Sequence, residues 1–350
     1  MPRAFAVGKL PLDVLQRALA RVPIEDERVR IGPRIGEDAA AIAFDHMYLI
    51  AKTDPITFAA ERIGWYAVHI NANDVAVMGA RPRWFLAALL LPEGKTDAAL
   101  VDRIFQDIVS ACQELGITLC GGHTEITYGL DRPVIVGHML GEVPRERLIE
   151  KRMEPGDHIL LTKGIAIEGT AILAREKAAE LISGGDAALV ERAARFLFDP
   201  GLSVVREALR AAEVARVHAM HDPTEGGLVA GLWELAIAGD VGMHIWRERI
   251  RIWPETEVLC RRFGLDPLRL IASGALLIVA PPPECAKIIK ALREEQIDVA
   301  QIGEVREKAY GLKLEVAGEL IELTPPDRDE IARVFEASES SRSGERFGSP

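Results

Sequence analysis

Two aspartates stand where a carboxylate could hold a metal ion. Asp38 lies just before a predicted strand, in the run GEDAA (36–40), where the glycine allows a tight turn. Asp54 follows a predicted strand over 47–52, and ligand groups of open α/β sheets gather where strands end. Magnesium takes oxygen ligands from one or two carboxylates, together with phosphate and water. The structural alternatives are a surface turn at Asp38 and a cap for the following segment at Asp54.

A cluster of polar residues interrupts an otherwise apolar stretch that ends near residue 80. It consists of Asn71, Asn73 and Asp74. Asn71 and Asp74 are three positions apart, so they share a face if the segment is helical, as we predict for 57–79. Buried amides and carboxylates are costly unless they have partners. The cluster therefore indicates a ligand or metal role, and solvent exposure is the simpler alternative.

A pair of glycines follows a short predicted strand over 117–120. The run CGGHTE (120–125) predicts a polar loop, in which Gly121 and Gly122 let backbone amides approach an anion. It is not a Walker loop, because no Lys-Ser/Thr pair follows the glycines. Glu125 is a candidate metal ligand. His123 is either a functional residue or an ordinary polar residue of the loop.

The run HDPTEGG (221–227) predicts the end of a strand, a turn and the start of a helix. Thr224 is expected to cap that helix, and Glu225 suits its first turn. Two glycines at a helix start cost about 1 kcal/mol each relative to alanine. Their presence indicates that a ligand or another backbone lies close.

Two further residues complete the candidate phosphate-binding set. Lys163 follows a predicted strand over 158–162, where it could reach a phosphate or belong to a surface turn. Asp222 lies in the turn after the strand that ends near residue 221, so it is a candidate cofactor-binding residue.

The composition restricts the kinds of partner. The chain has 350 residues, 49% of them apolar and 27% charged, as in an ordinary globular protein. Lys and Arg number 42 against 53 Asp and Glu, so the net charge is −11. This balance argues against nucleic acid as the main partner, because neutralising phosphates needs a basic face. A phosphate ligand would need a metal to offset the charge.

Several absences in the sequence predict a soluble cytoplasmic protein without a membrane partner. The four cysteines are widely spaced, which fits reduced thiols rather than a zinc site. The apolar runs are shorter than the ~20 residues that a membrane span needs. The N-terminus is too short and polar for a signal peptide.

The order of predicted elements indicates an α/β (α+β) fold in two domains. The predicted helices cover 12–22, 57–79, 97–115, 166–181, 202–214, 225–238, 285–294 and 327–336. The predicted strands cover 39–44, 47–52, 83–91, 117–120, 133–143, 158–162, 275–280, 299–305, 312–316 and 320–323. A charged segment over 144–155 separates the two sets, so the expected domains are 1–147 and 148–336. Residues 337–350 are rich in Ser, Gly and charge, and we expect a disordered tail.

Taken together, these motifs resemble the aminoimidazole ribonucleotide synthetase (PurM-like) superfamily. Its members include thiamine monophosphate kinase, selenophosphate synthetase and the hydrogenase maturation factor HypE. The match runs from residue 8 to about residue 335, and HypE-like proteins are the most similar, helped by GLDP (264–267) and SGALL (273–277). The resemblance implies an N-terminal domain that forms a β-barrel across a homodimer, and a C-terminal α/β sandwich.

The resemblance also implies ATP and Mg²⁺ in a cleft between the N-terminal domain and the dimer partner. Asp38, Asp54 and Asp74 would bind the phosphates through magnesium, with help from Asn73. The loop with Gly121, Gly122 and Glu125 would line the same cleft. The candidate catalytic residues are Asp74, His123 and Glu125, and the other cofactor-binding candidates are Lys163 and Asp222.

One feature departs from the resemblance. HypE proteins end in a Pro-Arg-Ile-Cys tail whose cysteine carries a carbamoyl group, whereas the last cysteine here is Cys285. We therefore expect no such adduct on the tail.

The leading functional hypothesis is a HypE-like ATP-dependent enzyme. It would activate an oxygen of a small or protein-bound substrate by phosphorylation or dehydration, with hydrogenase maturation proteins as candidate partners. The alternatives are a small-molecule kinase like thiamine monophosphate kinase and a non-catalytic nucleotide-binding regulatory protein.

Overall fold

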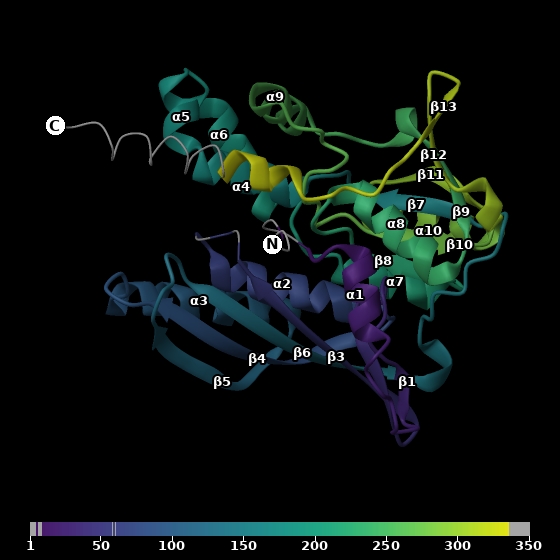
Figure 1. Ribbon diagram of the computed structural model, residues 1–350, viewed down its shortest axis with the longest axis horizontal. Coiled ribbons are helices and arrows are strands. Elements are labelled where there is room, and N and C mark those ends of the chain that lie inside the picture. Colours follow the sequence, from purple (N-terminus) through teal and green to yellow (C-terminus); the bar gives the residue numbers. More distant parts are fainter. Residues whose placement is uncertain (1–4, 6–8, 58, 60, 336–350) are drawn as a thin grey trace, which may run out of the picture.

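Two α/β halves pack against each other across one buried helix (Figure 1). The computed structural model describes residues 5, 9–57, 59 and 61–335. Each half contains one sheet with helices beside it, so the predicted two-part α/β fold is confirmed. The predicted tail over 337–350 lies outside the described residues. In the part of the chain that the structure describes, no helix is both long and apolar enough to span a bilayer.

The first sheet has the strand order β1-β2-β3-β6-β4-β5 and is antiparallel except between β4 and β5. Its strands are β1 (Val29–Ile31), β2 (Ala40–Phe44), β3 (Met47–Ile56), β4 (Arg81–Pro92), β5 (Thr118–Thr127) and β6 (Val134–Pro144). Buried and half-buried residues alternate along β6, because successive side chains point to opposite faces. The helices α2 (Ile63–Ala76) and α3 (Ala98–Leu115) cover one face of this sheet, whereas the short α1 (Leu12–Leu19) stands beside it (Figure 1).

The prediction of a loop over residues 120–125, which include the paired glycines, is wrong. Residues 120–125 continue the edge strand β5, which pairs with β4 from Trp84 to Pro92. The backbone of Gly122 has a φ of +148°, and a Cβ there would lie 2.0 Å from the carbonyl oxygen of Ala87. Close pairing with β4 therefore explains why this position is glycine.

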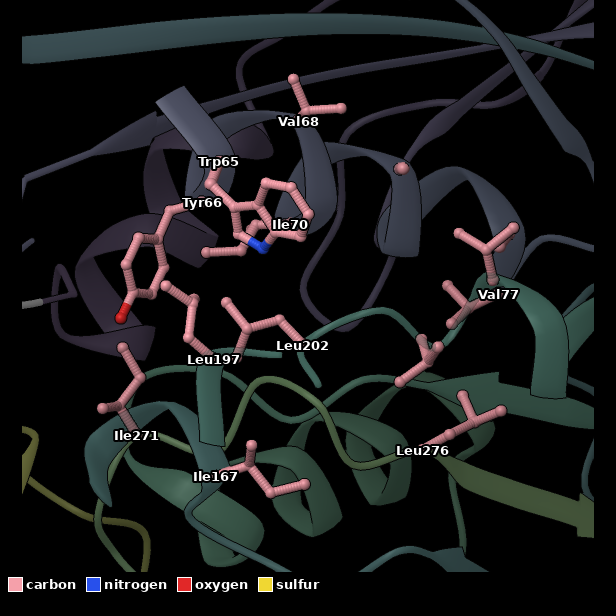
Figure 2. Close-up of a cluster of buried hydrophobic side chains, with 14 of the residues drawn as sticks. Trp65, Tyr66, Val68, Ile70, Val77, Ile167, Leu197, Leu202, Ile271 and Leu276 are labelled. Atoms are coloured by element: carbon pink, nitrogen blue, oxygen red, sulfur yellow. The ribbon is translucent and has the colours of Figure 1, made fainter. Parts of the chain in front are cut away.

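The helix α2 has no solvent-facing side, since all its residues are buried. It begins at Ile63, later than predicted, because Arg62 before it adopts the left-handed region with a φ of 62°. Figure 2 shows Trp65 and Tyr66 of α2 facing Leu197, Leu202 and Ile271 of the second half. An apolar helix of this kind belongs in the interior of a protein rather than at its surface.

The second sheet has the strand order β13-β12-β9-β11-β7-β10-β8. Its strands are β7 (His158–Thr162), β8 (Ala219–His221), β9 (Gly242–Trp246), β10 (Leu277–Ala280), β11 (Val299–Arg306), β12 (Leu312–Val316) and β13 (Glu319–Glu322). The helices of this half are α4 (Ile167–Glu176), α5 (Ala178–Ser183), α6 (Ala187–Ala194), α7 (Val205–Val214), α8 (Gly227–Gly239), α9 (Pro254–Phe263) and α10 (Pro282–Glu294).

Several predicted elements of the second half need correction. The helix predicted over 166–181 is two helices, because the chain leaves helical geometry at Lys177. The sequence did not predict β9, α6 or α9. The helix α8 begins at Gly227 without the expected side-chain cap from Thr224, and Asp329 instead accepts a hydrogen bond of 2.6 Å from the Gly226 amide.

The two halves are joined by the chain between β6 and β7 and by a side chain of α2. β6 ends at Pro144 and β7 begins at His158, so the expected boundary at 147/148 falls in this connection. A second link comes from Asn73 on α2. Its side-chain amide donates to the Leu202 carbonyl at 2.8 Å, and its oxygen accepts from the Val204 amide at 2.8 Å.

Candidate nucleotide and metal site

A cavity of about 520 Å³ lies between the two halves. Its walls come from the N-terminal segment and α1, the turn before β2, β3, α2, and the segment from β8 to α8. The charged side chains that line it are Lys9, Arg34, Glu37, Asp38, Lys52, Asp54, Asp74, His221, Asp222, Glu225 and Glu234. Such a mixed and highly charged lining is suited to a polar ligand rather than an apolar one.

Three buried carboxylates form the centre of this cavity. Asp38, Asp74 and Asp222 each offer an oxygen, and the three oxygens lie within 4.8 Å of one another. They come from the start of β2, from α2 and from the end of β8, elements that are distant in sequence. Neither oxygen of Asp222 makes a hydrogen bond within the described residues. Buried carboxylates without partners fit a hard divalent cation such as magnesium.

Lys52 on β3 partly balances the charge of this centre. Its Nζ lies 3.3 Å from Asp74 Oδ2 and 3.6 Å from Asp54 Oδ2. The contact with Asp74 lacks hydrogen-bond geometry, so that oxygen remains available. Burial acts to lower the pKa of Lys52, but the attraction of Asp74 and Asp54 outweighs it and holds that pKa above its usual value.

Asp74 and Asp222, the two central carboxylates with oxygens that make no hydrogen bond to a described residue, have raised pKa values in the absence of a metal ion. Burial raises the pKa of Asp74 well above its ordinary value, and the Asp222 and Asp54 charges add to the rise. Burial and the Asp38 charge together raise the pKa of Asp222 to about 7. A bound cation would favour the ionised forms, so the electrostatics of the site suit a metal ion.

Asp38 is held by two cations from the second half and the connection. Lys151 Nζ lies 2.6 Å from one of its oxygens, and His221 Nδ1 lies 2.6 Å from the other. The Nε2 of His221 is 2.9 Å from Glu234 Oε2, so both ring nitrogens face carboxylates and both must donate. Although burial opposes protonation, Asp38 raises the pKa of His221 to about 9. Both oxygens of Asp38 are therefore already bonded, unlike those of Asp222.

Lys9 connects the N-terminal segment to the opposite wall of the cavity. Its Nζ lies 3.0 Å from Glu234, 3.3 Å from Thr224 Oγ1 and 3.8 Å from Glu225. Burial alone would raise the pKa of Glu234. The neighbouring Lys9 and His221 outweigh burial and lower this pKa to about 2. The Lys9 ammonium therefore lies in the wall of the cavity, beside a carboxylate whose pKa is lowered.

The structure brings together four of the predicted site residues. Asp38, Asp54, Asp74 and Asp222 all line the cavity. Asn73 does not, because both of its polar groups bind the backbone of the 202–204 segment.

The other candidates lie elsewhere in the fold. Lys163 pairs with Glu207 at 2.8 Å and donates to the carbonyls of Gly201 and Ser203, beside a different cavity. Four more candidates, Gly121, Gly122, His123 and Glu125, lie on the exposed edge strand β5 and do not line the site cavity. The His123 ring and the Glu125 carboxylate are 3.3 Å apart. Their expected role in the cleft stays a prediction for a dimer.

Among the charged residues of the site that sequence reasoning missed, five make the ion pairs described above. They are Lys9, Lys52, Lys151, His221 and Glu234. His221 and Lys52 lie one and two positions before Asp222 and Asp54, so closeness to a candidate was an available signal. Nothing local marks Lys151 or Glu234, since their partners are brought to them by the fold.

Comparison with known proteins places the chain in a family. The model "AIR synthase related protein, N-terminal domain" matches residues 36–143, and the model of the C-terminal domain matches residues 154–315. The chain therefore belongs to the AIR synthase related protein family.

Several of the similar proteins carry names from hydrogenase maturation. A hydrogenase expression/formation protein of Methanocaldococcus jannaschii is 27% identical over 94% of this chain and 97% of its own length. The carbamoyl dehydratase HypE of Cupriavidus necator is 31% identical over 78% of each chain. The crystal structure of hydrogenase maturation protein HypE in complex with ATP has a TM-score of 0.69 at 25% identity, with 91% of both chains covered.

Proposed function

We propose that this protein is a HypE-like ATP-dependent enzyme that binds MgATP in the cavity between its halves. The observation that carries the proposal is the set of buried carboxylates from Asp38, Asp74 and Asp222, two of which have oxygens without hydrogen bonds. A chain of net charge −11 needs a cation to receive a polyphosphate at such a centre. The ATP complex of the structural relative supports the same ligand.

In this proposal Asp74 and Asp222, with Asp38 and Asp54 beside them, hold the magnesium. The metal would neutralise phosphate charge, which is the main requirement of phosphoryl transfer. Lys52 keeps Asp54 and Asp74 oriented toward the cavity, because it lies within ion-pair distance of both. Lys9 at the cavity edge supplies a further positive charge for the phosphate chain. Positioning by these fixed charges supplies most of the catalysis.

The names of the relatives suggest the biological role. Since they are hydrogenase formation proteins and carbamoyl dehydratases, we infer that ATP activates an oxygen atom of a substrate in hydrogenase maturation, and that other maturation proteins are the partners.

We also infer a homodimer, because the edge strand β5 exposes Ile126 at 58% and is followed by Tyr128 at 90% exposure. An unprotected edge of this kind is a template for pairing with another chain.

Calorimetry with ATP and Mg²⁺ tests the binding site. Asp74→Asn and Asp222→Asn should each weaken MgATP binding by about tenfold or more, a loss of roughly 1.4 kcal/mol. Asp102→Asn, on the exposed side of α3, is the matched control and should bind as the native protein does. Unchanged affinity in both site variants would overturn the assignment.

A further inference from the structure

A groove with a volume of about 450 Å³ lies between residues 145–152 of the connection and residues 212–218, which lead from α7 into β8. It shares no lining residue with the nucleotide cavity in the part of the chain that the structure describes. Its charged and ionisable lining residues are Arg145, Glu146, Arg147, Glu150, Arg152, Arg216 and His218. Four arginines against two glutamates give this groove an excess of positive charge, whereas the whole chain has a net charge of −11.

Two of these arginines are available to a ligand. Arg152 is already paired with Glu150. The guanidinium groups of Arg147 and Arg216, in contrast, make neither an ion pair nor a hydrogen bond with any residue that the structure describes. A guanidinium stays charged at every physiological pH, and its fork of N–H donors matches the two oxygens of a carboxylate. The free cations of the groove therefore suit an anionic group that comes from outside the chain.

Hydrogen bonds of the backbone hold the two walls of the groove in place. The Arg152 amide donates to the His218 carbonyl at 3.0 Å, which joins one wall to the other. The Arg216 amide donates to the Glu284 carboxylate at 3.0 Å. That carboxylate is also paired with Lys287 at 2.6 Å, so its charge is already balanced. The groove is thus formed before any partner binds, which lowers the cost of binding.

Apolar side chains share the lining with the charges. They are those of Leu148, Ile149, Ala212, Ala215 and Val217. A free phosphate or a nucleic-acid backbone has no apolar group to place against such a surface, and the acidity of the whole chain further disfavours nucleic acid. A peptide segment, in contrast, can carry acidic and apolar side chains next to each other. The lining therefore fits a peptide better than a small anion.

We propose that this groove is a docking surface for an acidic segment of a partner protein, whose carboxylates pair with Arg147 and Arg216 and whose apolar side chains contact the apolar lining. Clusters of arginine recognise acidic motifs in this way, because a guanidinium binds a carboxylate through two parallel hydrogen bonds. Complementary charges also steer the encounter of the two proteins. The inference goes beyond the proposed function and does not depend on it, because the groove is separate from the nucleotide cavity.

Fluorescence anisotropy with a defined probe tests the binding. The probe is a short fluorescein-labelled peptide of alternating glutamate and leucine, and its control has glutamine in place of each glutamate. The full-length protein at low salt should bind the acidic peptide with a Kd below about 1 mM, at least about tenfold tighter than the glutamine peptide. Added salt should weaken the binding, since it screens exposed charges. Equal affinity for the two peptides, or no binding of the acidic one in this range, would overturn the proposal.

Charge reversal tests the two arginines themselves. Arg147→Glu and Arg216→Glu should each raise the Kd for the acidic peptide by about tenfold or more. Both side chains are exposed, so the fold should tolerate the change. The control is Arg103→Glu, an exposed position of α3 outside the groove, which changes the net charge equally and should bind as the native protein does. The same loss in all three variants would show attraction to the chain as a whole and would rule out the groove.

Other occupants of the groove would give different results. A fluorescein-labelled single-stranded oligonucleotide should bind more weakly than the acidic peptide, and tighter binding would refute a peptide partner. Light scattering should report the same mass for Arg216→Glu as for the native protein. A change in mass would make the groove an interface between copies of this chain and would end the proposal.

MgATP affinity separates this inference from the proposed function. Calorimetry should show native MgATP binding in Arg147→Glu while the affinity for the acidic peptide falls, and this result supports the docking surface. Native peptide binding in both charge-reversal variants would refute the docking surface and leave the ATP assignment intact. If the native protein binds the acidic peptide but not MgATP, the proposed function fails and the docking surface stands.

Discussion

The Nδ1 atom of His221 lies 2.6 Å from Asp38 Oδ1, although 183 positions separate the two residues in the chain. Asp38 belongs to the first half and His221 to the second, so the pair joins the halves in the wall of the cavity between them. Gly36 makes the approach possible. Its φ is +82°, and a Cβ there would lie 2.4 Å from the carbonyl oxygen of Glu234 on α8.

Removing His221 should destabilise the protein strongly. His221→Ala leaves Asp38 and Glu234 buried with one fewer cation, and breaking a buried pair in this way costs about 3–5 kcal/mol. Urea denaturation measures the loss. The control is His46→Ala, since His46 pairs with Asp45 at the exposed surface. A loss below about 1 kcal/mol, the value for an exposed pair, would contradict the proposed importance of the buried contact.

Stability should fall in mild acid because of His69. Both of its ring nitrogens are buried without partners, and burial lowers its pKa to about 3, with Lys163 adding to the effect. The unfolded chain binds a proton near pH 6.5, so the unfolded state holds more protons between these two values. The contribution of His69 is therefore constant above pH 7 and is lost progressively as the pH drops below 6.5.

The variant His69→Gln isolates this effect. The native protein should lose about 2 kcal/mol more than the variant between pH 7.5 and pH 5, as follows from the shift in pKa. Urea titrations of both proteins at the two pH values give the difference. Equal losses would show that His69 is protonated or hydrated in the folded protein.

Asn73 should contribute to folding rather than to nucleotide binding. Its two hydrogen bonds hold the 202–204 segment of the second half to α2. Asn73→Ala leaves the Leu202 carbonyl and the Val204 amide unsatisfied, which should cost about 1–3 kcal/mol. Calorimetry well below the melting temperature should show MgATP affinity within about twofold of native. A tenfold weaker affinity would return Asn73 to the ligand set that the sequence predicted.

Asp74 should lower the stability of the metal-free protein and contribute to its stabilisation by Mg²⁺. Without divalent ions, Asp74→Asn should melt at a higher temperature than the native protein, because it removes a buried carboxylate beside Asp222 and Asp54. Adding Mg²⁺ should raise the melting temperature of the native protein more than that of the variant. Equal responses to the ion would argue against a metal site at this position.

The edge strand β5 predicts the oligomeric state. Light scattering should report twice the 38.3 kDa of one chain at micromolar concentration. Ile126→Lys places a charge on this exposed edge and should shift the protein toward the monomer. Lys95→Ala, beyond the end of β4, is a surface control. A native protein that stays monomeric would contradict the dimer.

The sequence predicted the two-part fold and the central aspartates because both depend on local signals. Apolar runs mark most strands. Asp222 directly follows the end of β8, and Asp54 lies two residues before the end of β3, which continues past the predicted end at residue 52. The GEDAA run similarly marks Asp38 through a glycine whose turn allows no side chain. The aspartates and this glycine can be recognised from their place next to a predicted strand or turn. That place is visible within a single short segment of the sequence.

The errors arise where distant contacts decide the structure. Gly121 and Gly122 are typical of a phosphate loop, but pairing with β4 keeps this segment in a strand. Asn73, a predicted ligand residue, binds the backbone of the 202–204 segment, and its role in nucleotide binding stays a prediction. Lys151 was invisible because its partner lies 113 positions away. Polar residues indicate that a partner exists, and only the fold shows which partner it is.

The complete burial of α2 has a consequence for how this chain can change in evolution. One side of the helix packs on the first sheet and the other on the second half. Each half would therefore expose apolar side chains to water if the other half were absent. A gene fragment encoding residues 1–147 alone would display Trp65, Tyr66 and Ile70 to water and would be prone to aggregate. The two halves must therefore be inherited together, and recombination that separates them is selected against.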